Sequence, residues 1–285
     1  MERWLLLSNC QTFGLANSFS LLNSKLHVDS ADIWTFKVDA ERYNREMADY
    51  DRVIVHPDII MAPEFDASRA VNINHLPSID FGAYHPDFGY FWIDGTFVNS
   101  PMTAYHSVIA VAAYNEGLSL ADTRRLYNGR MYEACGYHRD WAPQRDALLR
   151  RYKDHGVDLA ASFQHWGRGR AFMYSVNHPR IEELYQVARA FVLALGLPIT
   201  ETDIVPADNL IAGPCLPVYD EVGEMLGVRG SYLFKAVGRY AYVGLDTFLD
   251  ESFAIFAGHG RHVIQPHPHY QPRYDQVLSV IRGQA

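Results

Sequence analysis

Short apolar runs alternate with helical spacing along the first sixty residues. Residues 3–8 form an apolar run of the length of a buried strand, and the next apolar side chains recur on one helix face. These helix-face residues are Leu15, Phe19, Leu22 and Leu26. Apolar runs at 33–39 and 52–57 predict two more strands, with a helical segment near 40–49 between them. This order predicts an α/β fold with a parallel-sheet core like that of flavodoxins or SGNH hydrolases.

The middle of the chain changes from strand to helix periodicity. We expect residues 100–165 to form a mainly helical insertion, or lid, within a single α/β domain spanning residues 1–285. A strand signal returns at 170–176 and is followed by a strongly amphipathic helix from Ile181. The helical segments of the insertion are 102–116, 120–135 and 143–155.

Polar clusters stand where three of the predicted elements end. Ser8-Asn9-Cys10-Gln11 follows the first strand, Asn177-His178 follows the strand at 170–176, and His267 precedes the last helix. Ligands of open parallel sheets collect at the carboxyl ends of the strands. We therefore expect these clusters to line one site. Two His-Pro-Asp corners, at 56–58 and 85–87, are of the same kind, although such turns are also common in ordinary loops.

Cys10 is the candidate nucleophile because a helix is predicted to begin directly after it. The free N–H groups and partial positive charge of a helix N-terminus favour a thiolate, so a lowered pKa is expected for Cys10. The same N–H groups can hold an oxyanion. The alternative is a buried cysteine that packs as a small apolar side chain, although the flanking Asn9 and Gln11 would be unusual there.

A histidine is needed as a general base, and two are candidates. Pro266 and Pro268 restrict the loop around His267, which can then be aimed at Cys10 from a rigid base. His178 is the other candidate, although Asn177 before it also suits the cap of the following helix. A zinc site among the histidines at 259, 262, 267 and 269 is an alternative, but no cysteine or carboxylate pattern accompanies them, so no metal is expected.

Charge and cysteine content narrow the classes of function. The formal net charge is −8, which argues against a nucleic-acid-binding protein because phosphate contacts need a basic face. Three scattered cysteines do not suit a disulfide framework and fit a reducing compartment. The apolar run at the N-terminus is too short for a signal peptide, and no apolar stretch is long enough to cross a membrane. We therefore expect a cytoplasmic protein.

Several motifs, in their order along the chain, resemble the WcbI family of capsular polysaccharide biosynthesis proteins. The S-N-C-Q segment at 8–11 is similar to that family's G-N-C-Q signature, with Ser8 in place of glycine. The V-N-H-P segment at 176–179, the G-S-Y-L-F-K segment at 230–235 and the late H-P-H-Y segment at 267–270 are similar in kind and order. The resemblance spans nearly the whole chain.

A looser resemblance is to SGNH-type hydrolases and acyltransferases. Ser8-Asn9-Cys10 stands where those enzymes carry their G-D-S turn, and His267-Pro268 stands where they carry the base. The nucleophile would be cysteine rather than serine. The position of the orienting carboxylate is occupied by Ile264, which puts a full triad in doubt.

The family resemblance implies an acyl-coenzyme A-dependent O-acyltransferase, with acetyl-coenzyme A as substrate and a glycan or sugar nucleotide of a capsular or surface polysaccharide as acceptor. Either Cys10 is acylated and a histidine activates the sugar hydroxyl, or transfer is direct and Cys10 lines the thiol end of the cofactor site. The alternatives are a cysteine-based esterase or deacylase and a non-catalytic protein that binds coenzyme A or carbohydrate. Phosphates of the cofactor need cationic partners. The candidate cofactor-binding residues are Ser8, Asn9, Gln11, Asn177, Arg168, Arg170 and Lys235.

Overall fold

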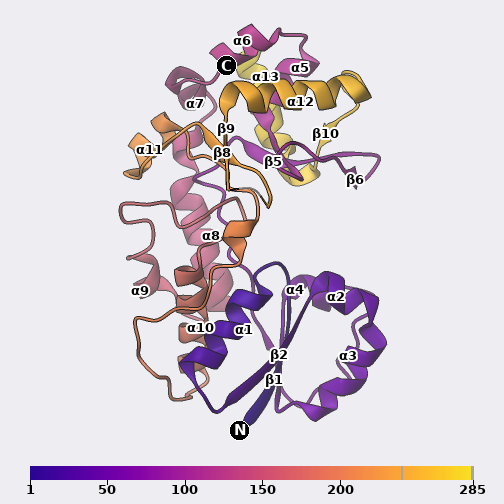
Figure 1. Ribbon diagram of the computed structural model, residues 1–285, viewed down its shortest axis with the longest axis vertical. Coiled ribbons are helices and arrows are strands. Elements are labelled where there is room, and N and C mark those ends of the chain that lie inside the picture. The colour runs from indigo at the N-terminus through magenta and orange to yellow at the C-terminus, as the bar shows by residue number, and fades with distance from the viewer. Residues whose placement is uncertain (239, 284–285) are drawn as a thin grey trace. The chain divides into compact units, whose positions relative to one another are not determined.

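The computed structural model describes residues 1–238 and 240–283, and these divide into two compact units. The first unit comprises residues 1–80, 145–166 and 177–211, and the second comprises residues 81–144, 167–176 and 212–285. The chain therefore passes between the units several times. Figure 1 shows the elements of each unit with the labels used here.

The first unit is built on a four-stranded parallel sheet in the order β2-β1-β3-β4. This confirms the predicted α/β class with a parallel sheet. Leu7 pairs with Val55, Ser8 with Asp32, and Val55 with His75, so the strands end at one common edge. The strands are β1 (Glu2–Ser8), β2 (Leu26–Asp32), β3 (Arg52–Val55) and β4 (Ile73–His75).

Helices cover both faces of this sheet, as Figure 1 shows, because side chains of a strand alternate between its faces. Trp4 lies on one face and contacts Phe19 and Phe191, with ring centroids 5.4 and 6.2 Å away. Leu5 and Leu7 lie on the other face in a separate apolar cluster that includes Phe36 and Met47. The helices of this unit are α1 (Thr12–Leu22), α2 (Ile33–Val38), α3 (Ala40–Glu46), η1 (Met47–Asp49), α4 (Pro57–Ile60), α9 (Ala160–Phe163) and α10 (Ile181–Ala194).

Helix α1 packs closely against α10, and Gly14 makes this possible. A Cβ atom at this position would lie 2.6 Å from a methyl carbon of Leu184. Helix α8 (Trp141–Asp154) begins in the second unit and ends in the first, and η3 (Leu210–Ala212) also stands at a boundary.

The second unit is centred on the antiparallel strand β5 (Phe88–Ile93), which pairs with three short strands. A separate hairpin joins β8 (Leu233–Lys235) to β9 (Tyr242–Gly244). The partners of β5 are β6 (Thr96–Phe97), β7 (Tyr105–Ser107) and β10 (Gln265–Pro266). The helices are α5 (Val108–Asn115), α6 (Leu120–Arg125), α7 (Gly129–Ala134), η2 (Tyr137–Arg139), α11 (Asp220–Leu226), α12 (Leu245–His259), η4 (Pro268–Tyr270) and α13 (Gln271–Ile281).

The core of the second unit contains a buried carboxylate, Asp87, surrounded by tyrosines. Its side chain accepts hydrogen bonds from Tyr137 and Tyr219, at 3.0 and 2.8 Å, and from Ser107 and the backbone N–H of Ile109. Burial raises the pKa of Asp87 to about 6 in spite of these four donors. The carboxylate therefore connects β5, α5 and the loop before α11.

Two predicted strands are wrong. Residues 33–38 form helix α2, because Asp32 caps it by accepting a hydrogen bond from Thr35 N–H, and the strand is the preceding segment 26–32. Residues 170–176 contain no strand. Of the predicted helices of residues 100–165, the one at 102–116 is shortened to α5, the one at 120–135 is divided into α6 and α7, and the one at 143–155 corresponds to α8. These helices belong to both units. The role of this segment as a lid stays a prediction.

Candidate functional site

The candidate site lies at the carboxyl edge of the parallel sheet in the first unit. Cys10 follows β1 and is half-buried, and α1 begins two residues later at Thr12, as predicted. Asn9 shapes this turn: its side-chain oxygen accepts from Gln11 N–H at 3.0 Å, and its backbone oxygen accepts from Thr12. The side-chain oxygen of Asn9 is thus used within the turn itself.

Gln11 holds two distant segments beside Cys10. Its side chain is fully buried, and its amide nitrogen donates to the backbone oxygens of Ile79 and Asn177, each at 2.9 Å. Its amide oxygen accepts from Ile79 N–H at 3.0 Å. Asn177-His178 is therefore brought to the edge that carries Cys10, as predicted, although no strand precedes it. We call these hydrogen bonds of the Gln11 side chain the Gln11 clamp. Asp80 directly follows Ile79 in the chain.

The expectation of a lowered pKa for Cys10 is wrong. Burial above all, together with the negative charges of Asp80 and Asp32, raises the pKa of the thiol to about 12. The positive end of α1 does not outweigh these effects. Burial and two nearby carboxylates raise the free energy of the thiolate by more than one helix terminus lowers it. Cys10 is consequently a neutral thiol near pH 7.

This electrostatic setting predicts slow alkylation of Cys10. A pKa about three units above the ordinary value reduces the thiolate about a thousandfold at neutral pH, and the higher intrinsic reactivity of a basic thiolate offsets part of this. We expect iodoacetamide to modify Cys10 at least about 30-fold more slowly at pH 7.5 than it modifies glutathione, with a rate that still rises at pH 10. Peptide mapping against the C10A variant measures this. A rate that levels off near pH 8 would show an activated thiol instead.

A hydrogen-bonded row of polar side chains lies at the same edge and was not anticipated as a unit. The Nε2 atom of His56, directly after β3, lies 3.1 Å from the hydroxyl of Ser78, and that hydroxyl donates to Asp80 at 2.7 Å. His56 and Ser78 are buried. Burial lowers the pKa of His56, which keeps its ring neutral. The His-Pro-Asp corner was visible in the sequence, but Ser78 and Asp80 follow a strand of only three residues and gave no periodic signal.

Burial also lowers the pKa of His178, to about 4, and the nearby Asp208 opposes this only in part. A neutral imidazole is the form that a general base requires. The lowered pKa also makes His178 a weaker base, and its catalytic role stays a prediction.

The remaining predicted site residues lie in the second unit. His267 follows β10, which pairs with the antiparallel strand β5, so the argument that it follows the edge of the parallel sheet is wrong. Its ring lies against Trp92 and Phe97, with centroids 4.7 and 6.1 Å away. Its Nδ1 accepts from His269 N–H at 3.3 Å. The proximity of His267 to Cys10 stays a prediction.

The three predicted cationic residues differ in the exposure of their side chains. Arg168 and Arg170 are exposed, next to Gly167 and Gly169 with φ of 70° and 78°. Lys235 is buried, and its ammonium group donates to the backbone oxygens of Gly213, Ala212 and Ala236. All three N–H donors of Lys235 are thereby used, which makes the arginines the better candidates for phosphate contacts.

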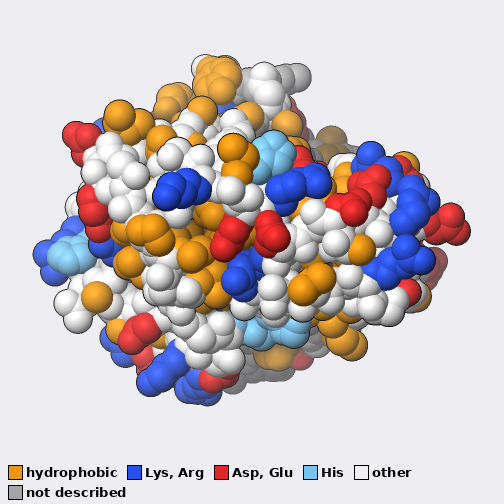
Figure 2. Space-filling view, turned by 90° about the horizontal axis from the view of Figure 1, so that it is seen from below, with side chains coloured by type: hydrophobic (Ala, Val, Ile, Leu, Met, Phe, Trp, Pro, Cys, Tyr) orange, Lys and Arg blue, Asp and Glu red, His pale blue; other side chains and the backbone are white. Residues whose placement is uncertain are grey.

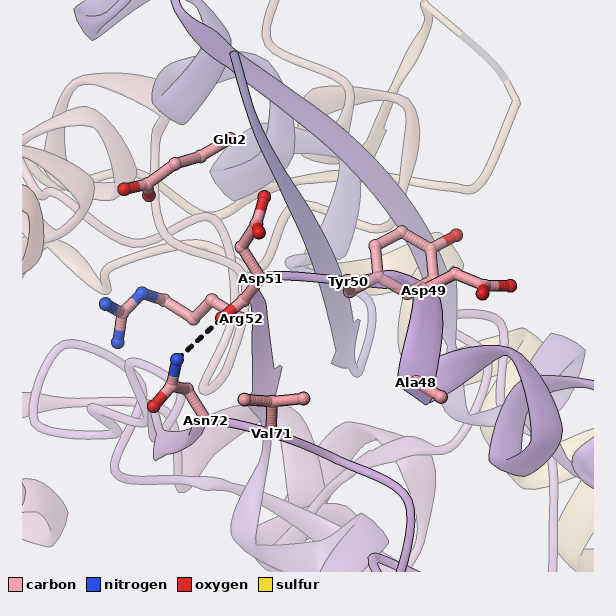
Figure 3. A pocket seen from close by; sticks show the side chains of 8 residues that line it. All are labelled: Glu2, Ala48, Asp49, Tyr50, Asp51, Arg52, Val71 and Asn72. Carbon is pink, nitrogen blue, oxygen red and sulfur yellow. Dashed lines mark hydrogen bonds between the residues drawn. The ribbon is translucent and has the colours of Figure 1, made fainter.

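A pocket at the opposite, amino edge of the sheet has a different character (Figure 3). Its lining residues include three acidic ones, Glu2, Asp49 and Asp51, and one basic one, Arg52. The backbone oxygen of Asp51 accepts from Asn72, which is the dashed bond in Figure 3. This balance of charge disfavours a phosphorylated ligand. Figure 2 likewise shows Lys and Arg side chains interspersed with Asp and Glu on the face seen from below.

Across residues 1–238 and 240–283, no group of three or more His, Cys, Asp or Glu side chains is arranged to hold a metal ion. In the same part of the chain, no helix has the length and apolar character needed to cross a membrane.

Comparison with known proteins gives two matches. The profile of the family described as "Polysaccharide biosynthesis enzyme WcbI" matches residues 3–200. A solved structure of WcbI superposes with a TM-score of 0.71 at 13% sequence identity, over 99% of this chain and 96% of that one. It is described as a novel polysaccharide biosynthesis enzyme, in a native form without a disulfide bond between coenzyme A and a cysteine. At this identity the superposition shows a common fold. No curated protein matches the chain.

Proposed function

Because the chain belongs to the WcbI family of polysaccharide biosynthesis enzymes, we propose that it transfers an acyl group, acetyl first among them, from coenzyme A to a sugar hydroxyl of a capsular or surface polysaccharide. The observation that carries this proposal is the position of Cys10 at the carboxyl edge of the parallel sheet, where such folds bind ligands. The solved WcbI structure is described as a native form without a disulfide bond between coenzyme A and a cysteine, and Cys10 is our candidate for the group that corresponds to that cysteine.

The surroundings of Cys10 suit the pantetheine arm of a coenzyme. Phe13 and Trp34, in the first turns of α1 and α2, are 51% and 63% exposed at the same edge. Large apolar side chains left open beside polar groups are typical of a ligand site. Exposed arginines 168 and 170 are our candidates for the cofactor phosphates.

Between the two possible routes, direct transfer agrees better with the charge state of Cys10. A covalent acyl-cysteine needs a thiolate, and the raised pKa of Cys10 opposes its formation. In direct transfer the neutral thiol lies beside the sulfur of coenzyme A and donates a hydrogen bond to it as it departs. The histidine candidates for the base on this route are His178 and His267.

Coenzyme A should stabilise the protein against heat. A ligand at 100 times its Kd stabilises the native state by about 2.7 kcal/mol, which raises Tm by several degrees. We expect this shift for coenzyme A and acetyl-coenzyme A, measured by differential scanning fluorimetry. No shift at millimolar concentrations of either would refute the proposed cofactor.

A pair of ligands locates the thiol end. The C10W variant should lose most of the shift caused by coenzyme A, because the indole fills the place of the thiol. It should keep the shift caused by adenosine 3′,5′-bisphosphate, which lacks the pantetheine arm. Dependence of acetyl-coenzyme A consumption on an added glycoside separates a transferase from a deacylase, whose acceptor is water.

A further inference from the structure

The clamp formed by Gln11 places a second reactive group beside Cys10. Both polar atoms of the Gln11 side chain bind the backbone of Ile79, and Gln11 and Ile79 are the chain neighbours of Cys10 and Asp80. The charge of Asp80 is the largest electrostatic contribution to the raised pKa of Cys10 after burial. The Gln11–Ile79 hydrogen bonds thus bring the segment of Asp80 to the segment of Cys10, and the charge of Asp80 acts on the thiol.

One oxygen of Asp80 is held firmly in place. Its Oδ2 accepts from Ser78 at 2.7 Å and from Arg151 Nη1 at 3.4 Å, and Arg151 Nη2 donates to the backbone oxygen of Asp80 at 3.3 Å. The hydroxyl of Ser78 is held in turn by His56. Because His56 Nδ1 accepts from Asp58 N–H at 3.1 Å, its proton is on Nε2 and is donated to Ser78.

The other oxygen of Asp80 is open. Within residues 1–238 and 240–283, no hydrogen-bond donor reaches Oδ1, and the side chain is 45% exposed. A partly exposed carboxylate with one oxygen fixed by a buried serine and an arginine, and with no donor on the other oxygen, has the arrangement of a positioned proton acceptor at the proposed thiol end of the cofactor. Its two neighbouring carboxyl-edge residues, Asp32 and Asp58, lack this buried support: Asp32 caps α2, and Asp58 is 75% exposed.

We propose that Asp80, in place of the histidine candidates His178 and His267, is the general base of the acyl transfer, positioned by Ser78, Arg151 and His56; this inference rests on the proposed function. Oδ1 accepts the proton of the acceptor hydroxyl as that oxygen attacks the carbonyl carbon of the thioester. The new C–O bond forms, the C–S bond breaks, and coenzyme A leaves as a thiolate that accepts a hydrogen bond from the neutral thiol of Cys10. Asp80 then returns the proton to the sulfur of coenzyme A, so no other reactant is consumed.

The test compares D80N with D154N. Asp154 is an exposed carboxylate on α8, the helix that also carries Arg151, and serves as the matched control. Release of coenzyme A from acetyl-coenzyme A is followed by chromatography, with water and with methyl glycosides as acceptors. We expect D80N to lower kcat at least about 100-fold, the usual contribution of a general base, with the Kd for coenzyme A unchanged within about twofold. D154N should behave as the wild type.

The split between kcat and cofactor binding separates positioning from structural support. The Ser78 hydroxyl holds Oδ2 of Asp80 at 2.7 Å, so S78A should lower kcat at least about tenfold while the Kd for coenzyme A stays within about twofold. A variant that is only less stable would lose binding and activity together.

Two results would overturn the role of Asp80. One is a kcat for D80N within threefold of the wild-type value. The other is a wild-type protein that binds coenzyme A but does not release it from acetyl-coenzyme A at any pH. If the wild type does not bind coenzyme A, the proposed function fails, and the alkylation rate of Cys10 still tests the placement. Loss of the nearby charge should raise that rate about two- to fivefold in D80N at pH 8.5 but not in D154N. Equal rates would show that Asp80 does not lie beside the sulfur.

Discussion

Exchanging Gln11 for glutamate is expected to destabilise the first unit by about 3–5 kcal/mol, although the two side chains have the same shape. The amide of Gln11 donates to the backbone oxygens of Ile79 and Asn177, and a carboxylate would place negative charge against both. Because Gln11 is fully buried, water cannot relieve this repulsion. Denaturant unfolding at pH 8 measures the loss.

The pH dependence of Q11E identifies the cause. Burial and the two carbonyl oxygens would raise the pKa of the new carboxyl above its value in the unfolded chain. A group whose pKa is raised by folding binds more protons in the native state, so the stability of Q11E falls as pH rises above about 4.3. The matched control is Q164E, at an exposed position of the same unit, which should stay within about 0.5 kcal/mol of the wild type. Equal stability of Q11E and Q164E at pH 8 would contradict the clamp.

Loss of the Asp87 carboxylate should destabilise the second unit by a similar amount. In D87A the hydroxyls of Tyr137 and Tyr219 and the N–H of Ile109 lose their acceptor inside a core that excludes water, which costs about 3–5 kcal/mol in total. The control is D250A, on the exposed side of α12, with little change expected. A difference below 1 kcal/mol between the two variants in denaturant unfolding would refute this role.

Asp87 also makes wild-type stability depend on pH. Its pKa is raised to about 6 in the folded protein, chiefly by burial, whereas the unfolded chain has the ordinary value near 4. The folded state therefore holds the proton more tightly, and the contribution of this group to stability falls as pH rises from about 4 to 6. D87N should flatten this part of the profile, because the amide does not titrate.

The hydrophobic pattern determined those elements whose own side chains form the core. Residues 4–7 are apolar because β1 lies in the interior of the sheet with both faces covered, and the helix from Ile181 shows its buried face as a periodic stripe. The position of Cys10 between β1 and α1 followed from the apolar run of β1 and the helical spacing of apolar residues after it. The order of short motifs along the chain also predicted the family.

Elements at the edges of the sheet left no such pattern. Strand β2 is an edge strand of mostly polar residues, and its conformation is set by backbone pairing with β1 rather than by its own side chains. The more apolar segment after it was therefore mistaken for the strand. Strand β4 has only three residues, so Ser78 and Asp80 could not be placed at the carboxyl edge beforehand.

The sequence alone thus determined the fold class, the family and the candidate cysteine, because each depends on local pattern or on residue order. Only the tertiary structure decided the charge state of Cys10 and which side chains surround it. Burial and the carboxylates of Asp80 and Asp32 reach the sulfur from segments up to 70 residues away, and they reverse the effect expected from the adjacent helix. Electrostatic free energy depends on distance and burial in space, which residue order does not contain.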